Sequence, residues 1–249
     1  MNQQRGGGKT MFDIKGKYAL VTGGSRGIGE AIAYALSDKG AKVAIFYRSN
    51  EEKAKKVADK IGGIAQKVDV AKVDEIKKGV NEVISQFGTI DILVNNAGII
   101  GKNMSTLKVT EEEWDLLMDT NLKGMFFVTQ AVLPYMMKKG GKIVNLASIA
   151  GRMGGAAGAH YAASKAGAIG LTRRWAIEFA KYGICVNAIA PGPVDTGLLT
   201  DELKKQLSEI TPLGRIATPD EIAHTAIYLI ENDYVTGAVA DINGGRYMG

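Results

Sequence analysis

Cysteine, histidine and long apolar runs are scarce in this sequence, and each scarcity excludes a class of protein. The single Cys185 rules out a disulfide framework and an all-cysteine metal site, and it fits a reducing, cytoplasmic setting. The two histidines, His160 and His224, are too few for the usual zinc catalytic cluster, so we expect no metal. No apolar run reaches the roughly 18–20 residues that a membrane-spanning helix needs, so we expect no membrane partner.

Strong charge of one sign is also missing. The formal net charge is +5, with a sequence pI near 9.1. Arg5 and Lys9 supply two of these charges from the glycine-rich segment 1–11, which we expect to be a flexible leader or an expression remnant. The other lysines stand beside acids, as in EEKAKKVADK at 51–60, a pattern typical of solvated helix faces. A basic stripe for nucleic acid is therefore not indicated.

Short β-branched runs alternate with amphipathic helical patterns along the rest of the chain. The expected strands are 18–24, 42–48, 64–70, 90–98, 142–148, 185–192 and 238–244. Capping residues mark two helix starts, Thr110 with Glu113 and Thr218 with Glu221. Seven short strands separated by helices predict one α/β domain over 12–249, a Rossmann fold with a doubly wound, seven-stranded parallel sheet and helices on both faces. Ligands of such sheets bind beyond the carboxyl ends of the strands.

The turn after the first expected strand predicts a phosphate cradle. TGGSRGIG at 22–29 opens a helix, and its glycines allow backbone N–H groups to approach a pyrophosphate at the positive helix end. The alternative is a plain glycine-rich turn. The residues expected to hold the cofactor here are Gly23, Ser25, Arg26, Gly27, Ile28 and Gly29.

The end of the second expected strand favours NADP(H) over NAD(H). An NAD-binding protein of this type carries an acid at the position of Tyr47, and the sequence has none there. Arg48 and Ser49 follow instead, and Arg26 stands in the glycine turn. Two guanidiniums suit a 2′-phosphate through bidentate, charge-assisted hydrogen bonds. The alternative is that both arginines are ordinary surface charges.

The third expected strand ends in Asp69 and Val70, where an adenine ring would lie. The Asp69 carboxylate could accept from the adenine amino group, and the N–H of Val70 could serve a ring nitrogen. A strand-ending turn acid is the alternative for Asp69.

Tyr161 and Lys165 lie four residues apart in HYAASKAGAIGL at 160–171, so on a helix they project side by side. Reduction of a ketone needs a hydride at carbon and a proton at oxygen. A free tyrosine titrates near ~10, and we expect Lys165 and an oxidised nicotinamide ring to lower the pKa of Tyr161. Ser148, at the end of the fifth strand, can orient the carbonyl. Read alone, the pair is a solvated helix edge and Ser148 an ordinary strand-end serine.

With NNAG at 95–98 and PGPVDT at 191–196, these motifs resemble the short-chain dehydrogenase/reductase family over about residues 12–249. Within it the chain is most similar to the 3-oxoacyl-(acyl carrier protein) reductases, through NLKG, YAASKAGAIGLT, VNAIAPG and DINGG. The resemblance implies that Asn121 supports a water-linked proton relay and that Lys165 also holds the nicotinamide ribose. Without it, Asn121 reads as a polar residue that kinks a helix. Further cofactor contacts are implied for Asn96, Ala97, Gly98, Pro191, Gly192, Val194 and Thr196.

The resemblance implies an NADP(H)-dependent oxidoreductase that reduces a ketone to a secondary alcohol by hydride transfer. The expected substrate is a 3-oxoacyl thioester, carried by acyl carrier protein in fatty acid biosynthesis. The alternative is an NADP-dependent alcohol, diketone or sugar dehydrogenase of the same family, for example one acting on glucose. A sensor of NADP(H) without catalysis is disfavoured, because Tyr161 and Lys165 are both retained.

Basic residues near the mouth of the site would steer an acidic carrier protein. We expect Lys138, Lys139 and Lys142 in MMKKGGK to do this, with Lys181 as a partial match to a second basic position. Similar enzymes pair the Asn121 helix and the Tyr161 helix across subunits, so we expect a homotetramer, with a dimer as the alternative. Apolar surface for this contact is expected from Trp175, Ile177 and Phe179.

Two segments are expected to form the substrate walls. One is 99–109, which follows NNAG, and the other is 197–219, here named the lid segment. The lid segment carries Leu198, Leu199, Leu203 and Leu207 at helical spacing, which indicates either a pocket lining or simple helix packing. His160 is expected in packing or at the substrate rim, and Cys185 as a small core residue.

Overall fold

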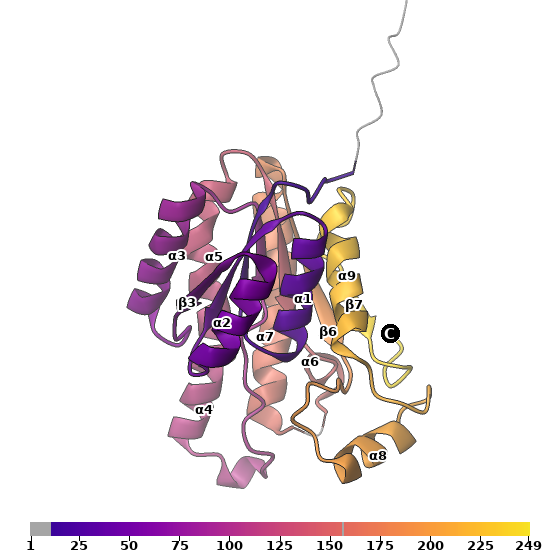
Figure 1. Cartoon of the computed structure of the whole chain (residues 1–249). Coiled ribbons are helices and arrows are strands. Elements are labelled where there is room, and N and C mark those ends of the chain that lie inside the picture. Colours follow the sequence, from indigo (N-terminus) through magenta and orange to yellow (C-terminus); the bar gives the residue numbers. More distant parts are fainter. Residues whose placement is uncertain (1–10, 156) are drawn as a thin grey trace, which may run out of the picture.

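The computed structural model describes residues 11–155 and 157–249, and its centre is a parallel sheet of seven strands. The strand order is β3-β2-β1-β4-β5-β6-β7, so the sheet winds outward in both directions from β1 and β4. This confirms the doubly wound α/β fold (Figure 1). The strands are β1 (Tyr18–Thr22), β2 (Lys42–Tyr47), β3 (Ile64–Lys67), β4 (Ile92–Asn95), β5 (Gly141–Leu146), β6 (Ile184–Pro191) and β7 (Val239–Ile242).

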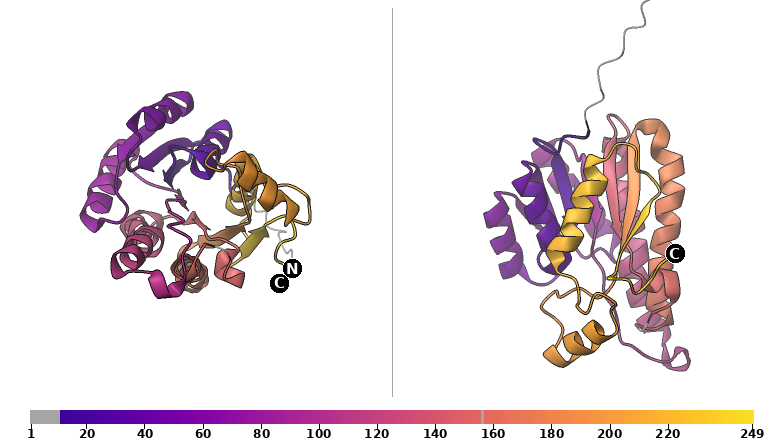
Figure 2. Two further views of the ribbon diagram at one scale, coloured as in Figure 1. Left: turned by 90° about the horizontal axis from the view of Figure 1, so that it is seen from below. Right: turned by 90° about the vertical axis from the view of Figure 1, so that its right-hand side faces the viewer.

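Helices cover both faces of the sheet. Those on one face are α1 (Gly27–Asp38), α2 (Glu51–Ile61) and α9 (Pro219–Glu231). Those on the other face are α3 (Val73–Phe87), α5 (Gly124–Met136) and α7 (Ala159–Phe179). The remaining helices, at or near the carboxyl edge of the sheet, are α4 (Glu111–Met118), α6 (Ala150–Met153) and α8 (Asp201–Glu209); Figures 1 and 2 show α4 and α8 beyond its lower end. Short helical turns are η1 (Thr106–Lys108), η2 (Asp119–Lys123) and η3 (Ala180–Tyr182).

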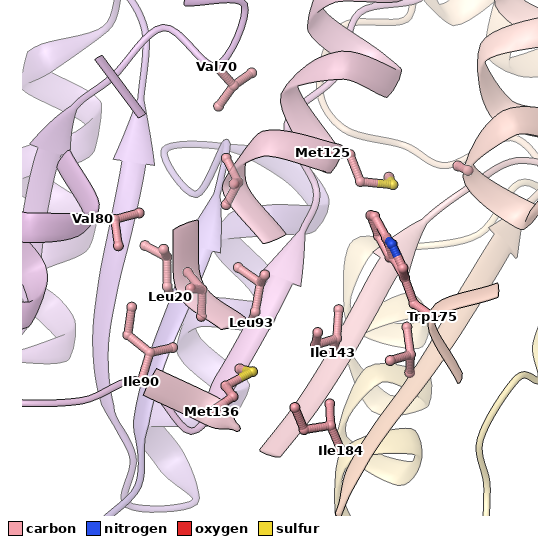
Figure 3. Packing of buried hydrophobic residues seen from close by; sticks show 14 of the residues in the cluster. Leu20, Val70, Val80, Ile90, Leu93, Met125, Met136, Ile143, Trp175 and Ile184 are labelled. Carbon is pink, nitrogen blue, oxygen red and sulfur yellow. The ribbon is translucent and has the colours of Figure 1, made fainter. Parts of the chain in front are cut away.

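Two apolar clusters hold the layers together, one on each face of the sheet. Alternation along β1 sends Leu20 into one cluster and Val21 into the other, as the two-residue period of a strand requires. Figure 3 shows the first cluster, to which Leu93 of β4 and Met136 of α5 both contribute. Trp175 belongs to this core and is 5% exposed, so our expectation that it adds to an outer surface is wrong.

Phe179 departs from expectation in the same way, because it too is buried, and Ile177 alone of the three residues is exposed. The three lie on α7, where Trp175 and Phe179 are four residues apart and share a face, while Ile177 points elsewhere. Of these three side chains, only that of Ile177 is accessible to solvent or to a partner.

All strands except β6 are shorter than expected, and several of the functional motifs fall in the loops that follow them. β3 ends at Lys67, so Asp69 and Val70 belong to the next turn rather than to the strand. The helix start at Thr218 has both hydrogen bonds of the capping box. At Thr110 only half of the box forms, because the Glu113 carboxylate pairs with Lys102 at 3.0 Å.

Some expectations lie outside the described residues. Residues 1–10 of the expected leader are among them, and Met11 is exposed. Within the described part of the chain, no helix is both long and apolar enough to cross a membrane. Nor does that part bring three histidine, cysteine or acidic side chains together as a metal site.

Candidate active site

The glycine turn after β1 is bound to the NNAG segment after β4. Thr22 Oγ1 accepts hydrogen bonds from the backbone N–H groups of Asn96 and Ala97, each at 3.0 Å. The Asn96 side chain donates in return to the carbonyls of Thr22 and Gly23, at 3.0 and 3.1 Å. Thr22 was not among the expected site residues, although it opens the TGG motif. These bonds fix the floor of the crevice between β1 and β4.

The glycines of this turn are needed for close approach. A Cβ on Gly29 would collide with the Asn96 side chain and the Gly23 carbonyl. Gly27 has a positive φ of 57°, and a Cβ there would lie 3.1 Å from Cβ of Thr196. The first turn of α1 has no side-chain cap, so its N–H groups can bind an anion. The cradle therefore fits the pyrophosphate of a dinucleotide.

The outer end of the crevice carries free positive charge. β2 ends at the buried Tyr47, and Arg48 and Ser49 follow it on the surface. Arg26 is exposed in the neighbouring glycine turn. Neither guanidinium forms an ion pair with any described residue. The acid that would bind a ribose hydroxyl is absent here, so this end fits a phosphate better than a bare ribose.

Asp69 already has a role in its own turn. Its Oδ1 accepts from the N–H of Ala71 at 3.1 Å, and its own N–H donates to Glu75 at 2.9 Å. Val70 is buried, and its carbonyl lies against Gly124 at the start of α5. The turn role that the sequence also allowed is thus present, and it leaves Oδ2 of Asp69 for an adenine amino group.

Ser148, Tyr161 and Lys165 come together at the carboxyl end of β5. Ser148 follows the strand by two residues, and its side chain lies close enough to the Tyr161 phenol to lower the pKa of that phenol. Lys165 is 5% exposed, and its Nζ donates to the carbonyl of Leu146 at 2.8 Å and lies 5.9 Å from the centre of the Tyr161 ring. Gly98 brings NNAG to the same place, because a Cβ there would lie 3.5 Å from Nζ of Lys165.

Burial governs the charges of this cluster in the protein without cofactor. Burial raises the pKa of Tyr161, and the hydrogen bond to Ser148 only partly offsets this. Burial also lowers the pKa of Lys165 from 10.5 to about 8. Without the nicotinamide ring that the expectation includes, Lys165 alone does not offset the effect of burial on the pKa of Tyr161. Tyr161 is a protonated donor at neutral pH.

Asn121 lies in η2, a π-helical turn between α4 and α5, and it is fully buried. Its side chain accepts from the N–H of Ile99 and donates to the carbonyl of Ile99, both at 2.8 Å. It also donates to Ser164 on α7, at 3.2 Å. The wider π turn places the amide where it binds the loop after NNAG. The π turn agrees with the reading of Asn121 as a polar residue that interrupts the helix, and its role in a proton relay stays a prediction.

The segment after β6 closes the other side of the crevice. Pro191 is the last residue of β6, and Gly192 packs so closely on Asn243 that a Cβ would lie 2.9 Å from its Cα. Val194 bridges to Ala217 in a short parallel pairing. Val194 O accepts from Thr196 N at 3.0 Å, and no described backbone carbonyl accepts from Val194 N. A carboxamide could bind that N–H.

The lid segment stands away from the core. Its helix α8 has no buried residue; Leu198 and Leu203 are 62% and 40% exposed, whereas Leu199 and Leu207 are half-buried, so both readings of these leucines stay open. The Lys204 ammonium joins α8 to Asp195 at 2.9 Å, next to Thr196. A cavity of about 630 Å³ opens between the end of α8 and residues 210–214.

His160 and Cys185 lie outside the cluster. His160 is 1% exposed, packs against the loop after β4, and lines a recess of about 280 Å³ with Trp114. This agrees with packing. Cys185 is partly exposed at the amino end of β6, 3.5 Å from Nζ of Lys142, rather than in the core.

The lysines expected at the mouth lie at the other edge of the sheet. Lys138, Lys139 and Lys142 precede or begin β5, and Lys181 precedes β6, so all four are near the amino ends of parallel strands. Lys139 pairs with Asp91 at 2.7 Å, and Lys142 is buried. Within one chain, our expectation that these residues flank the site is wrong.

Several known proteins are similar to this chain. Residues 23–246 match a family model described as enoyl-(acyl carrier protein) reductase. A 3-oxoacyl-[acyl-carrier-protein] reductase FabG from Staphylococcus epidermidis is 46% identical over 93% of this chain and 99% of its own length. One from Vibrio cholerae is 43% identical over 95% and 100%. A short-chain dehydrogenase/reductase mutant from Serratia marcescens has a similar solved structure, with a TM-score of 0.89 and 36% identity over 94% of this chain and 99% of its own.

Proposed function

The chain belongs to the short-chain dehydrogenase/reductase family and is an oxidoreductase that uses a nicotinamide cofactor, and from this premise we propose that it reduces 3-oxoacyl thioesters with NADPH. The observation that carries the proposal is the buried cluster of Ser148, Tyr161 and Lys165 at the carboxyl end of β5. This cluster lies beside a glycine cradle that fits a pyrophosphate.

The residues of the cluster divide the work at the carbonyl. A bound nicotinamide cofactor supplies the hydride. The Tyr161 phenol, kept protonated by burial, donates its proton to the carbonyl oxygen as negative charge develops there. Ser148 donates a hydrogen bond to the same oxygen and orients it. Lys165 would hold the ribose hydroxyls of a bound cofactor, and its positive charge would favour the Tyr161 phenolate that remains.

Arg48 and Arg26 select the phosphorylated cofactor in this proposal. Both guanidiniums are exposed and lack an ion pair within the described chain, so a 2′-phosphate would meet free donors. We expect Arg48→Ala to raise the KM for NADPH about 10- to 100-fold while the KM for NADH stays within about twofold, in keeping with the ~1.4 kcal/mol that each factor of ten represents. An equal effect on both cofactors, measured by initial rates, contradicts this selection.

An acyl thioester on a carrier protein is proposed as the substrate because the similar curated proteins are named for that reaction. Lys108 on η1 and Lys205 on α8 are two basic side chains that could steer an acidic carrier, since they follow the carboxyl ends of strands and form no ion pair with a described residue. Apolar residues support association into a homotetramer, with Phe126 of α5 and Ile177 of α7 being 38% and 75% exposed.

A substrate comparison tests the proposal. NADPH consumption is measured with acetoacetyl thioesters, and the reverse reaction is followed with NADP⁺ and glucose or small diols; diketones are tested in the forward direction. We expect the highest kcat/KM on acetoacetyl thioesters. A higher kcat/KM on a diketone, an alcohol or glucose would replace the proposed substrate by the family alternative. Tight cofactor binding with no turnover on any of them would indicate a sensor.

A further inference from the structure

Arg152 has contacts that the reaction described above does not use. It lies on α6, the four-residue helix that begins two residues after Ser148. Its guanidinium forms a two-pronged contact with the Asp241 carboxylate on β7, at 3.2 and 3.1 Å. It also donates to the carbonyl of Val239 at 3.3 Å. The side chains of Arg152 and Asp241 are only 17% and 21% exposed, so solvent screens this pair less than a surface ion pair.

A second side of α6 is pressed against the catalytic helix. A Cβ on Gly151 would lie 2.6 Å from the carbonyl carbon of Lys165 and 2.8 Å from the nitrogen of Ala166. The short helix is therefore held between α7, where Gly151 touches the backbone, and β7, where Arg152 is bound. A four-residue helix has too few internal hydrogen bonds to keep its place without such contacts.

The position of α6 is transmitted to Ser148 by a hydrogen bond. The Ala150 N–H, in the first turn of α6, donates to Ser148 Oγ at 3.1 Å. The Ile149 N–H donates to the Pro191 carbonyl at 3.1 Å, which ties the same turn to β6. Movement of α6 away from α7 would therefore move the Ser148 hydroxyl relative to the Tyr161 phenol.

We propose that Arg152 is a positioning residue for the reaction: bound to Asp241, it holds α6 against α7 and so keeps the Ser148 hydroxyl at the Tyr161 phenol. Asp241 binds the guanidinium from β7, so the last strand of the sheet helps to position Ser148. The inference rests on the proposed roles of Ser148 and Tyr161. It assigns Arg152 no contact with substrate or cofactor.

The test compares Arg152→Met with Asp241→Asn, the second variant keeping the size of the side chain and one hydrogen-bonding oxygen. We expect kcat to fall about 10- to 100-fold in Arg152→Met, because displacements of about 1 Å in a positioned group have effects of this size. The affinity for NADPH, measured by fluorescence of the bound cofactor, stays within about twofold. Asp241→Asn should also lower kcat, but by a smaller factor than Arg152→Met.

A second background separates positioning from general weakening of the fold. In Ser148→Ala protein, Arg152→Met should lower kcat by less than a further twofold, because the group through which it acts is gone. Lys39→Met is the matched control, since Lys39 pairs with Glu231 at 2.7 Å between α1 and α9, far from the site, and its kcat should not change. Equal losses from Arg152→Met in both backgrounds, or no loss in folded Arg152→Met and Asp241→Asn, would overturn the inference. Full turnover in Ser148→Ala would instead refute the proposed function.

Discussion

Two lysines are buried at opposite ends of β5, and their surroundings differ. Lys142, the second residue of the strand, is 3% exposed and pairs with Asp233 at 2.8 Å. Lys165 is 5% exposed and donates to the carbonyl of Leu146, the last residue of the same strand, at 2.8 Å. No described carboxylate lies within ion-pair distance of Lys165. The charge of Lys142 is therefore neutralised by a carboxylate, and that of Lys165 is not.

This difference distinguishes a structural charge from a reactive one. A buried cation without a counter-ion costs the fold stability and shifts toward its neutral form, which is why the pKa of Lys165 falls to about 8. Such groups cluster at functional sites, where a ligand supplies the missing partners. Lys165 lies at the carboxyl edge with Ser148 and Tyr161, whereas Lys142 lies at the amino edge. The three predictions below test this contrast.

The largest effect is expected for Lys165→Met. The variant keeps an apolar side chain of similar length in the buried position but removes the ammonium. We expect kcat/KM with NADPH to fall about 10²–10⁴-fold, the usual contribution of positioned acid–base groups. Steady-state kinetics measures it, with Lys142→Met as the matched control. Comparable turnover in the two variants would contradict the assignment.

The second prediction concerns stability and pH in the protein without cofactor. Because burial lowers the pKa of Lys165 from 10.5 to about 8, the unfolded chain binds more protons between these pH values, and the free energy of unfolding should rise as the pH rises through them. The shift corresponds to about 3 kcal/mol. Denaturant unfolding at several pH values measures it. Lys165→Met should be the more stable protein at pH 7, and the difference should vanish near pH 10.5.

If the stability difference between wild-type protein and Lys165→Met stays constant across this range, Lys165 does not titrate as described. The comparison of the two proteins at each pH cancels the contributions of all other groups, provided that both unfold reversibly.

The smallest change in activity is expected for Lys142→Met. Its loss removes the ion pair with Asp233 and the hydrogen bond to the carbonyl of Asn232, at 3.0 Å. Asp233 is 39% exposed and can regain water, so we expect the free energy of unfolding to fall by about 1–2 kcal/mol rather than by the larger cost of stranding a buried charge. Turnover should stay within about twofold. A large loss of kcat in folded Lys142→Met would show that the amino edge also controls the site.

Much of the fold could be predicted from the sequence, because alternating strand and helix patterns place the residue after each strand at one edge. That rule brought Ser148, Asn96 and Gly192 to the same crevice. The same rule also contradicts our placing of Lys138 and Lys139 at the mouth, since they precede β5. The position of these lysines before the strand already predicts the amino edge, and our expectation followed their charge instead.

Other features were not visible in the sequence. Arg152 and Asp241 are 89 residues apart, and no local pattern pairs them. The π turn around Asn121 depends on contacts with Ile99 across the crevice. The pKa of Tyr161 in the protein without cofactor depends on burial, which the sequence does not give; the lowering expected beside an oxidised nicotinamide ring stays a prediction. These features come from tertiary packing rather than from local pattern.

The most direct test of the account is turnover of an acetoacetyl thioester by Tyr161→Phe, measured as NADPH consumption beside direct titration of NADPH binding. The variant removes one hydroxyl and keeps the ring. We predict that turnover is abolished, while NADPH binds within about threefold of the wild-type affinity, a difference of less than ~1 kcal/mol. Full turnover by the variant would contradict the role of Tyr161 as the proton donor and, with it, the proposed function of the whole cluster.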